Sequence, residues 1–192
     1  VVAVSGDLVS VRDGRVAING VDEAASSAPH LVSLAWGGGP FADVVRAMQP
    51  RLGLDGLAAH RMAILAMQQY GLALQSLEPH LALAQTEAEL RAARAGVWLP
   101  WELAGMSREI EAGWDVTSDS LAAWLAARLG ARMLILVKSA PIEPGEATAA
   151  ELAGLGVVDP AFPAFARRLD APIRIVHRDI ALTDERHLRV RG

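Results

Sequence analysis

Short apolar runs and amphipathic segments follow one another along the chain, and their order predicts the fold class. Residues 1–11 (VVAVSGDLVSV) alternate apolar with polar positions and are rich in β-branched side chains, which favours a strand. An Asp-Gly pair at 13–14 followed by RVAI predicts a hairpin and a second strand. Residues 30–36 form a short apolar run that ends at a glycine, which is typical of a buried strand.

The next part of the chain carries the spacing of helices. Residues 41–51 place apolar side chains on one face, and Pro50 should end or kink this helix. Residues 58–74 are apolar around most of a helix circumference, which predicts a well-buried helix. Residues 85–96 form a polar helical stretch that stops at a glycine, and residues 97–100 (VWLP) are a candidate strand.

Residues 114–139 are the most informative segment for the fold. They predict an extended piece, a helix capped at Thr117 or Ser118 and ended by a glycine, and a strand at 133–137. Within this helix Trp124 lies at helical spacing with leucines, which favours packing in the core over stacking on a ligand.

Shorter elements are expected in the rest of the chain. Helices are predicted around 146–153 and 161–169 and a strand at 172–177, whereas residues 139–148 have the composition of a surface loop. Strands and helices thus alternate over a length of 192 residues, which suits one domain with a real core. The pattern predicts an α/β fold: a three-layer α/β/α sandwich with a largely parallel central sheet.

Composition and charge narrow the function classes. A formal net charge of −4 without any block of basic residues argues against a nucleic-acid partner. No apolar stretch approaches the ~18 residues of a membrane span, and the opening residues lack a basic leader, so we expect a cytoplasmic protein without membrane contact. The chain has no cysteine, which excludes disulfides and thiolate metal sites within it.

Three consecutive glycines between a predicted strand and a predicted helix are the first candidate for chemistry. Gly37, Gly38 and Gly39 would offer bare backbone N–H groups and the positive end of a helix dipole to an anion. A flexible strand-to-helix turn explains the same residues without any ligand. Both interpretations are open at this point.

Two carboxylates bracket the start of the helix in the segment 114–139. Asp119 is either an acid that favours the helix N-terminus or a group that positions a cation near a transferring phosphoryl group. Asp115 either is structural or binds a substrate amine or hydroxyl. Trp36 and Trp114 each precede a candidate motif and either pack in the core or line a pocket.

Three stretches, GGGPFADVVR, AHRMAILAMQQYGLAL and WDVTSDSLAAWLAARLGARMLILVKS, resemble the amino acid kinase superfamily, which includes acetylglutamate, aspartate and uridylate kinases. The resemblance covers roughly residues 31–139 and is closest to the small branch from methanofuran and tetrahydromethanopterin biosynthesis. In that branch ATP phosphorylates an aminomethylfuran phosphate to a diphosphate. The resemblance implies an acceptor half at 1–115 and a reduced nucleotide-binding half at 116–192.

The resemblance implies a kinase that uses ATP and Mg²⁺ to phosphorylate a phosphate or carboxylate acceptor. Under it, Gly37, Gly38 and Gly39 form the loop at the phosphoryl and acceptor site. Asp115 stands where relatives place a polar acceptor-binding residue, and a cationic aminomethyl group would suit its carboxylate. A homo-oligomer is also implied, and the two apolar helices after the glycines have surface for it.

The remaining site residues follow from the same resemblance. Asp119 matches the acid that orients the catalytic lysines and the metal, with Mg²⁺ bound through the phosphates. Lys138 and Ser139 fall where relatives begin the nucleotide-binding half. His60 and Arg61 belong to the helix motif of this branch, and either is a candidate for the acceptor's phosphate, although a surface arginine is the commoner role.

The first strand departs from the family pattern, in which a lysine stabilises the transferring phosphoryl group. Ala3 stands at the lysine position, Ser5 replaces a glycine, and Asp7 places a negative charge where phosphate oxygens would lie. Loss of such a cation typically costs on the order of 10²–10³ in rate. Because Lys138 is the only lysine, the substitute must be Lys138, an arginine or Mg²⁺.

Two functions therefore stay open from the sequence. The chain is an active small-molecule kinase with altered phosphate chemistry, or a kinase-fold protein that has lost transfer and acts as a binding or assembly subunit. A third interpretation is a non-catalytic α/β domain in which the glycine run is only a turn.

Overall fold

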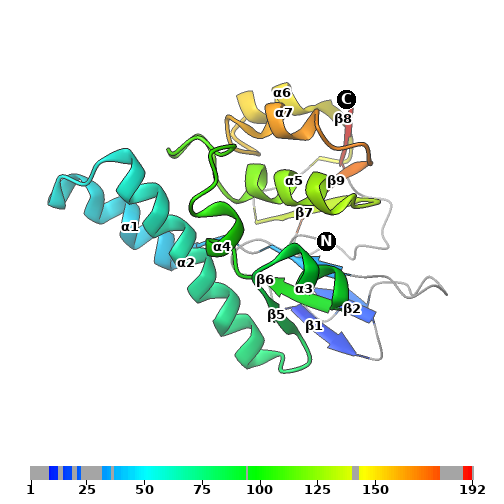
Figure 1. The fold of residues 1–192 in the computed structure, drawn as a ribbon. Coiled ribbons are helices and arrows are strands. Elements are labelled where there is room, and N and C mark those ends of the chain that lie inside the picture. The colour runs from blue at the N-terminus through cyan, green and yellow to red at the C-terminus, as the bar shows by residue number, and fades with distance from the viewer. Residues whose placement is uncertain are drawn as a thin grey trace.

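The computed structural model describes residues 9–12, 15–18, 21–22, 32–35, 37–93, 95–139, 143–177 and 188–191. Figure 1 shows these residues as strands and helices that alternate from an N-terminal hairpin through two long helices to a C-terminal group of strands and helices. None of the helices in this part of the chain is long and apolar enough to cross a bilayer.

The described N-terminal residues form a small antiparallel sheet. It contains β1 (Val9–Arg12), β2 (Arg15–Ile18) and β3 (Val21–Asp22), in that order. The pairing of β1 with β2 confirms the predicted hairpin. The predicted first strand at 1–11 is thus described only from residue 9. Three departures from the family pattern lie outside the described residues: Ala3, Ser5 and Asp7.

A second sheet is parallel throughout and has the order β4-β6-β5. Its strands are β4 (Val32–Leu34), β6 (Ala95–Trp98) and β5 (Ala82–Ala84). β6 lies between its two neighbours, and all four of its residues are buried. Such burial on both faces suits its short apolar sequence. Trp36, which follows β4, lies outside the described residues.

The predicted helix at 85–96 is wrong at its C-terminal end, and the predicted strand at 97–100 begins too late. Helix α3 covers only Glu87–Ala92, where Thr86 and Glu89 form a reciprocal capping box. Residues 95 and 96 belong to β6, so the glycine that was expected to stop a helix lies in a strand. The polar pattern predicted the existence of this helix correctly. At the C-terminal end of the predicted range, the pairing of β6 with two strands outweighs the helical spacing.

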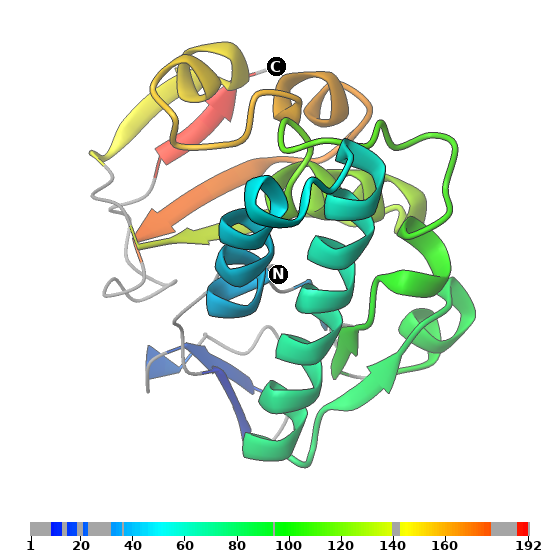
Figure 2. The ribbon, with the colours of Figure 1, turned by 90° about the vertical axis from the view of Figure 1, so that its left-hand side faces the viewer.

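Two long helices follow the glycine bend and pack side by side (Figure 2). Helix α1 (Gly39–Leu52) runs two residues past Pro50 and ends at Gly53, whose φ is +65°. Helix α2 (Gly56–Leu77) begins at Asp55, whose side chain accepts a hydrogen bond from the Ala58 N–H group. Both helices extend beyond the predicted ranges.

Helix α2 is not buried around its circumference, which corrects the prediction for residues 58–74. One face packs into the molecule, and the other leaves several large apolar side chains exposed: Leu57, Met62, Leu65, Leu72 and Leu77. The apolar composition of the helix therefore exceeds what its packing within this chain requires.

A close approach between α2 and β6 makes Gly71 sensitive to substitution. A Cβ atom at Gly71 would lie 2.9 Å from Leu99 Cδ2 and 3.1 Å from Val97 Cγ1. Gly71→Val is therefore expected to lower the free energy of unfolding by about 1–3 kcal/mol through overpacking. Chemical denaturation measures the change. Gly56→Val is the matched control, because open space surrounds Gly56; an equal loss in both variants would contradict the packing argument.

The C-terminal half forms a four-stranded sheet with the order β7-β9-β10-β8. Its strands are β7 (Leu134–Lys138), β9 (Ile173–His177), β10 (Leu188–Arg191) and β8 (Gly145–Thr148). Only the β9–β10 pair is antiparallel. The predicted strands at 133–137 and 172–177 are each within one residue of the observed ones. The predicted loop at 139–148 is wrong at its end, because β8 pairs with β10.

Helices cover this sheet and enclose the main core. Helix α5 (Ser118–Leu129) packs on α7 (Phe162–Ala166), and α6 (Ala149–Gly154) follows β8. A short helix, α4 (Trp101–Ala104), leads out of β6.

Trp124 is buried with its ring centroid 6.2 Å from that of Trp98, which confirms its predicted place in the core. The predicted α/β fold with mainly parallel strand pairs is confirmed.

Candidate functional site

The triple-glycine bend connects β4 to α1, and the fold itself requires glycine there. A Cβ atom at Gly38 would lie 2.5 Å from Ala42 Cβ and 3.4 Å from Ala66 Cβ, so any side chain would push the bend away from both long helices. Gly39 has a φ of +49°, a conformation that residues with side chains rarely adopt. The fold alone therefore explains why glycine occupies positions 38 and 39, independently of any ligand.

The bend nevertheless opens onto a cavity of about 270 Å³. All three glycines line it, and on the far side Thr117, Ser118 and Leu121 from the start of α5 complete the wall. Helices α1 and α2, which lie in front of α5 in Figure 2, form another side, and the segment before α5 also contributes, with Gly113, Trp114 and Val116. The two segments that the sequence singled out therefore face one shared space.

An indole and a guanidinium stack at one side of this cavity. The Arg46 Cζ atom lies 4.3 Å from the centroid of the Trp114 ring, and the Trp114 Nε1–H group donates to Gln49 Oε1 at 2.7 Å. The same guanidinium forms a 3.2 Å ion pair with Asp43. Trp114 thus lines the pocket, whereas sequence reasoning missed Arg46 and Asp43. Their only signal was a spacing of three residues on the helix after the glycines.

His60 lines the cavity from α2, as an uncharged group at neutral pH. Its Nδ1 atom lies 3.2 Å from the Gly113 carbonyl oxygen and 3.3 Å from the Gly113 amide nitrogen. Burial lowers the pKa of the imidazole, the contact with Gly113 raises it, and the neighbouring Arg61 charge lowers it further; the net direction is down. Arg61 does not line the cavity, and its buried Nε atom has no hydrogen-bond partner among the described residues.

The lowered pKa of His60 predicts a loss of stability in mild acid. Below pH 6.5 the unfolded chain takes up a proton at this histidine while the folded chain does not, so stability falls as the pH falls. His60→Gln should reduce the difference in melting temperature between pH 7.5 and pH 5.5, because glutamine does not titrate. Thermal melts of both proteins at the two pH values measure this difference. Equal pH dependence in the two proteins would contradict a neutral, buried imidazole.

Asp119 and Lys138 form a buried ion pair away from the cavity wall. The Lys138 Nζ atom lies 2.6 Å from each carboxylate oxygen, and the two side chains are 12% and 6% exposed for the lysine and the aspartate respectively. The Asp159 N–H group donates to Asp119 at 3.2 Å. Burial raises the pKa of Asp119, although the Lys138 charge opposes that shift. Neither residue of the pair lines the cavity.

The first turn of α5 is capped by a carboxylate from another part of the chain. Thr117 occupies the predicted cap position, yet its side chain makes no capping bond. Asp159 instead accepts hydrogen bonds from the Thr117 N–H group at 2.9 Å and the Ser120 N–H group at 3.0 Å. It also contacts both of their hydroxyls. Part of the anion-binding capacity of this helix end is thus already satisfied within the protein.

The two remaining predicted site residues lie outside the cavity. Asp115 is exposed, and its main-chain carbonyl accepts a hydrogen bond from the Ala161 N–H group at 3.0 Å. Ser139 is exposed at the end of β7, and its carbonyl oxygen lies 3.2 Å from His177 Nε2. The described residues contain no group of three side chains suited to hold a metal ion.

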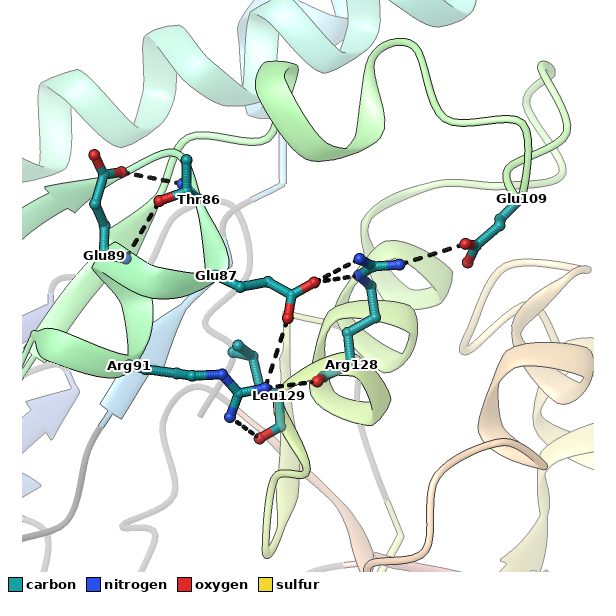
Figure 3. A network of polar contacts seen from close by, with 7 residues as sticks. All are labelled: Thr86, Glu87, Glu89, Arg91, Glu109, Arg128 and Leu129. Carbon is teal, nitrogen blue, oxygen red and sulfur yellow. Dashed lines mark hydrogen bonds and ion pairs between the residues drawn. The ribbon is translucent and has the colours of Figure 1, made fainter.

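A polar network at the other end of α5 fixes this helix against α3 (Figure 3). Arg91 donates to the main-chain carbonyls of Arg128 and Leu129, each at 2.8 Å, and so caps the C-terminus of α5. Arg128 in turn donates to Glu87 at 2.7 Å and contacts Glu109 at 3.4 Å. The helix whose start lines the cavity is therefore held at both ends by residues distant in sequence.

Comparisons with known proteins bear on the fold. No protein-family model and no curated protein matches the chain. Uridylate kinase from Archaeoglobus fulgidus is similar with a TM-score of 0.62 and 13% identity over 99% of both chains. UMP kinase from Ureaplasma parvum is similar with a TM-score of 0.67 and 14% identity over 100% of this chain and 97% of that one.

Aspartate kinase from Synechocystis is similar over 82% of this chain but only 33% of its own length, with a TM-score of 0.59 and 16% identity. Identities this low speak for the fold alone. The arrangement of strands and helices matches these structures over nearly the full length of the two nucleotide kinases. The chain therefore has the same α/β fold as these kinase structures.

Proposed function

We propose that this protein is a phosphotransferase that uses ATP to phosphorylate the phosphate or carboxylate group of a small acceptor. One observation carries the proposal: the triple-glycine bend and the first turn of α5 line the same cavity. Main-chain N–H groups at such a bend and the positive end of a helix both favour an anion. Similarity in fold to a uridylate kinase and a UMP kinase supports the same class of reaction.

The proposal divides the chain into two working halves within one domain of residues 1–192. Residues 1–115 would hold the acceptor, and residues 116–192 would hold the nucleotide near Lys138 and Ser139. In the reaction an oxygen of the acceptor's phosphate or carboxylate bonds to the γ-phosphorus of ATP. The bond from that phosphorus to the bridging oxygen breaks, and ADP leaves with the electron pair.

Asp119 is proposed to orient the Lys138 ammonium for this step. An ammonium has three N–H donors, and the two oxygens of Asp119 lie 2.6 Å from the nitrogen. Contacts to two oxygens leave one donor for an oxygen of the transferring phosphoryl group. Such a cation contributes by stabilising negative charge that develops during transfer.

The described residues do not fit a magnesium site held by the protein. No group of three ligating side chains is present among them, and both oxygens of Asp119 are already engaged by Lys138. Mg²⁺ would therefore arrive as MgATP, held by the phosphates of the nucleotide itself.

The proposed acceptor is an aminomethylfuran phosphate in the biosynthesis of a one-carbon carrier cofactor, on the strength of the sequence resemblance in the glycine, α2 and α5 segments. We also propose a homo-oligomer in the cytoplasm. Exposed apolar side chains on α1 and α2 support an interface between copies of the chain, among them Val44, Leu52 and Leu65.

A second function is favoured by the burial of Lys138, the single lysine of the sequence, in an ion pair with Asp119. Lys138 is buried against Asp119, and the described cavity wall contains Arg46 as its one cation that is charged at neutral pH. A kinase fold without a free lysine at the phosphoryl site would bind an acceptor or assemble with another protein without transferring phosphate.

Nucleotide binding and turnover decide between the two functions. For an active kinase, MgATP should raise the melting temperature of the protein, and ADP should be released only when aminomethylfuran phosphate is present. Lys138→Arg keeps the ion pair with Asp119 and should retain the thermal shift with MgATP. It should slow ADP release, because the planar guanidinium of arginine replaces the compact ammonium of lysine. No thermal shift with any nucleotide would favour the binding or assembly function.

A further inference from the structure

Two opposite charges stand next to each other on the cavity wall. Among the lining residues in the described part of the chain, Arg46 and Asp43 are the two that carry a formal charge at neutral pH, since burial lowers the pKa of His60. They lie on one face of α1, three residues apart, with Arg46 Nη1 3.2 Å from Asp43 Oδ1. Both side chains are more than half exposed.

Arg46 contacts the Trp114 indole as well as its carboxylate partner. Its guanidinium lies over the Trp114 ring at 4.3 Å, and Gln49 fixes that ring through a 2.7 Å hydrogen bond to Nε1–H. Stacking of this kind orients the planar guanidinium and leaves its edge free to donate. An ion pair as exposed as Arg46–Asp43 contributes little to stability, so another anion can replace Asp43 at small cost.

Replacement of Asp43 by a ligand anion at Arg46 also changes the environment of Asp43 itself. A phosphate or carboxylate that takes the guanidinium in bidentate fashion removes the cation from Asp43. The freed carboxylate then stands within the same cavity and attracts a positive group.

We propose that Arg46 and Asp43 select a small zwitterion as the acceptor, with its anionic group on Arg46 and its protonated amine on Asp43. This inference rests on the proposed function, in which the cavity holds the acceptor. It assigns the amine-binding role to Asp43, because Asp115 does not line the cavity, and the anion-binding role to Arg46 in place of Arg61.

Three simple probes test the two charges separately. They are O-phosphoethanolamine, which carries both charges, ethyl phosphate, which carries only the anion, and ethylamine, which carries only the cation. Calorimetric titration of the nucleotide-free protein should show O-phosphoethanolamine binding about tenfold more tightly than ethyl phosphate, since the added ammonium gains a carboxylate partner. Ethylamine alone should bind weakly, because Asp43 stays in its ion pair with Arg46 when no anion is bound to the guanidinium.

Two exposed substitutions separate the roles without disturbing the core. Arg46→Gln should weaken the binding of both phosphates about tenfold or more, whereas Asp43→Asn should remove the preference for O-phosphoethanolamine and retain ethyl phosphate. Arg51→Gln is the matched control, because Arg51 is exposed on the same helix and does not line the cavity. It should leave both affinities unchanged.

The outcomes distinguish this inference from the proposed function. Equal affinity of the wild-type protein for the two phosphates, or a preference that survives Asp43→Asn, would overturn the zwitterion proposal even if ATP turnover is observed. A preference that disappears in Asp43→Asn, in a protein that releases no ADP, would support the acceptor site while contradicting phosphoryl transfer. Insensitivity of ethyl phosphate binding to Arg46→Gln would remove Arg46 from the site.

Discussion

Lys138→Met should lower the free energy of unfolding by about 3–5 kcal/mol at neutral pH, because it strands the buried carboxylate of Asp119 without a cation. The loss should be smaller in acid. Burial already raises the pKa of Asp119, and removal of the lysine, whose charge lowers it, raises that pKa further. The neutral carboxyl is then favoured in the folded state, so the contribution of Asp119 to stability is greatest at low pH and is lost as the pH rises through the raised pKa. Urea denaturation at pH 5 and pH 8 measures both effects.

A double substitution provides the control for this experiment. Asp119→Asn combined with Lys138→Met leaves no buried charge, so the double variant should recover most of the stability lost by Lys138→Met alone. If both variants are equally destabilised at every pH, the cost comes from altered packing and the ion pair is not its source.

Asp159→Ala should cost about 2–4 kcal/mol, since it leaves the N–H groups of the partly buried Thr117 and the buried Ser120 without acceptors at the start of α5. The main-chain N–H group of residue 159 still donates to Asp119 in this variant, although loss of the Asp159 charge also removes one cause of the raised pKa of Asp119. Asp159→Asn retains one carbonyl oxygen and should lose less. Thermal and urea denaturation of the two variants measure the difference.

Asp170→Ala is the matched control for the cap, because Asp170 is an exposed aspartate in the same part of the chain. Its effect should stay within about 0.5 kcal/mol. An equal, small effect at both positions would show that water replaces the carboxylate at the α5 N-terminus.

The order of strands and helices was predictable from the sequence because it follows from local periodicity. Residues 114–139 gave the start of α5 and the position of β7 to within one residue. Errors occurred where pairing between distant strands decided the outcome. Residues 95–96 belong to a strand between two parallel neighbours, and residues 145–148 pair with β10. No local pattern contains that information.

The candidate site was predictable only in part, for the same reason. Glycine composition and the caps of α5 pointed to two segments that do line one cavity. The partners that complete their surroundings come from far along the chain: Asp159 caps a helix about forty residues earlier, and Gln49 orients Trp114 across 65 residues. Arg46 and Asp43 look like any surface ion pair on a helix until Trp114 is placed beside them.

The solitary lysine makes the buried pair open to direct chemical observation. Within these 192 residues Lys138 carries the only side-chain amine, and contact with Asp119 shields it from solvent. An amine-acylating reagent can therefore modify a side chain at one position only, and does so when α5 and β7 separate. The rate of that single acylation therefore measures how often α5 and β7 separate locally at Lys138, and the measurement requires no substrate or nucleotide.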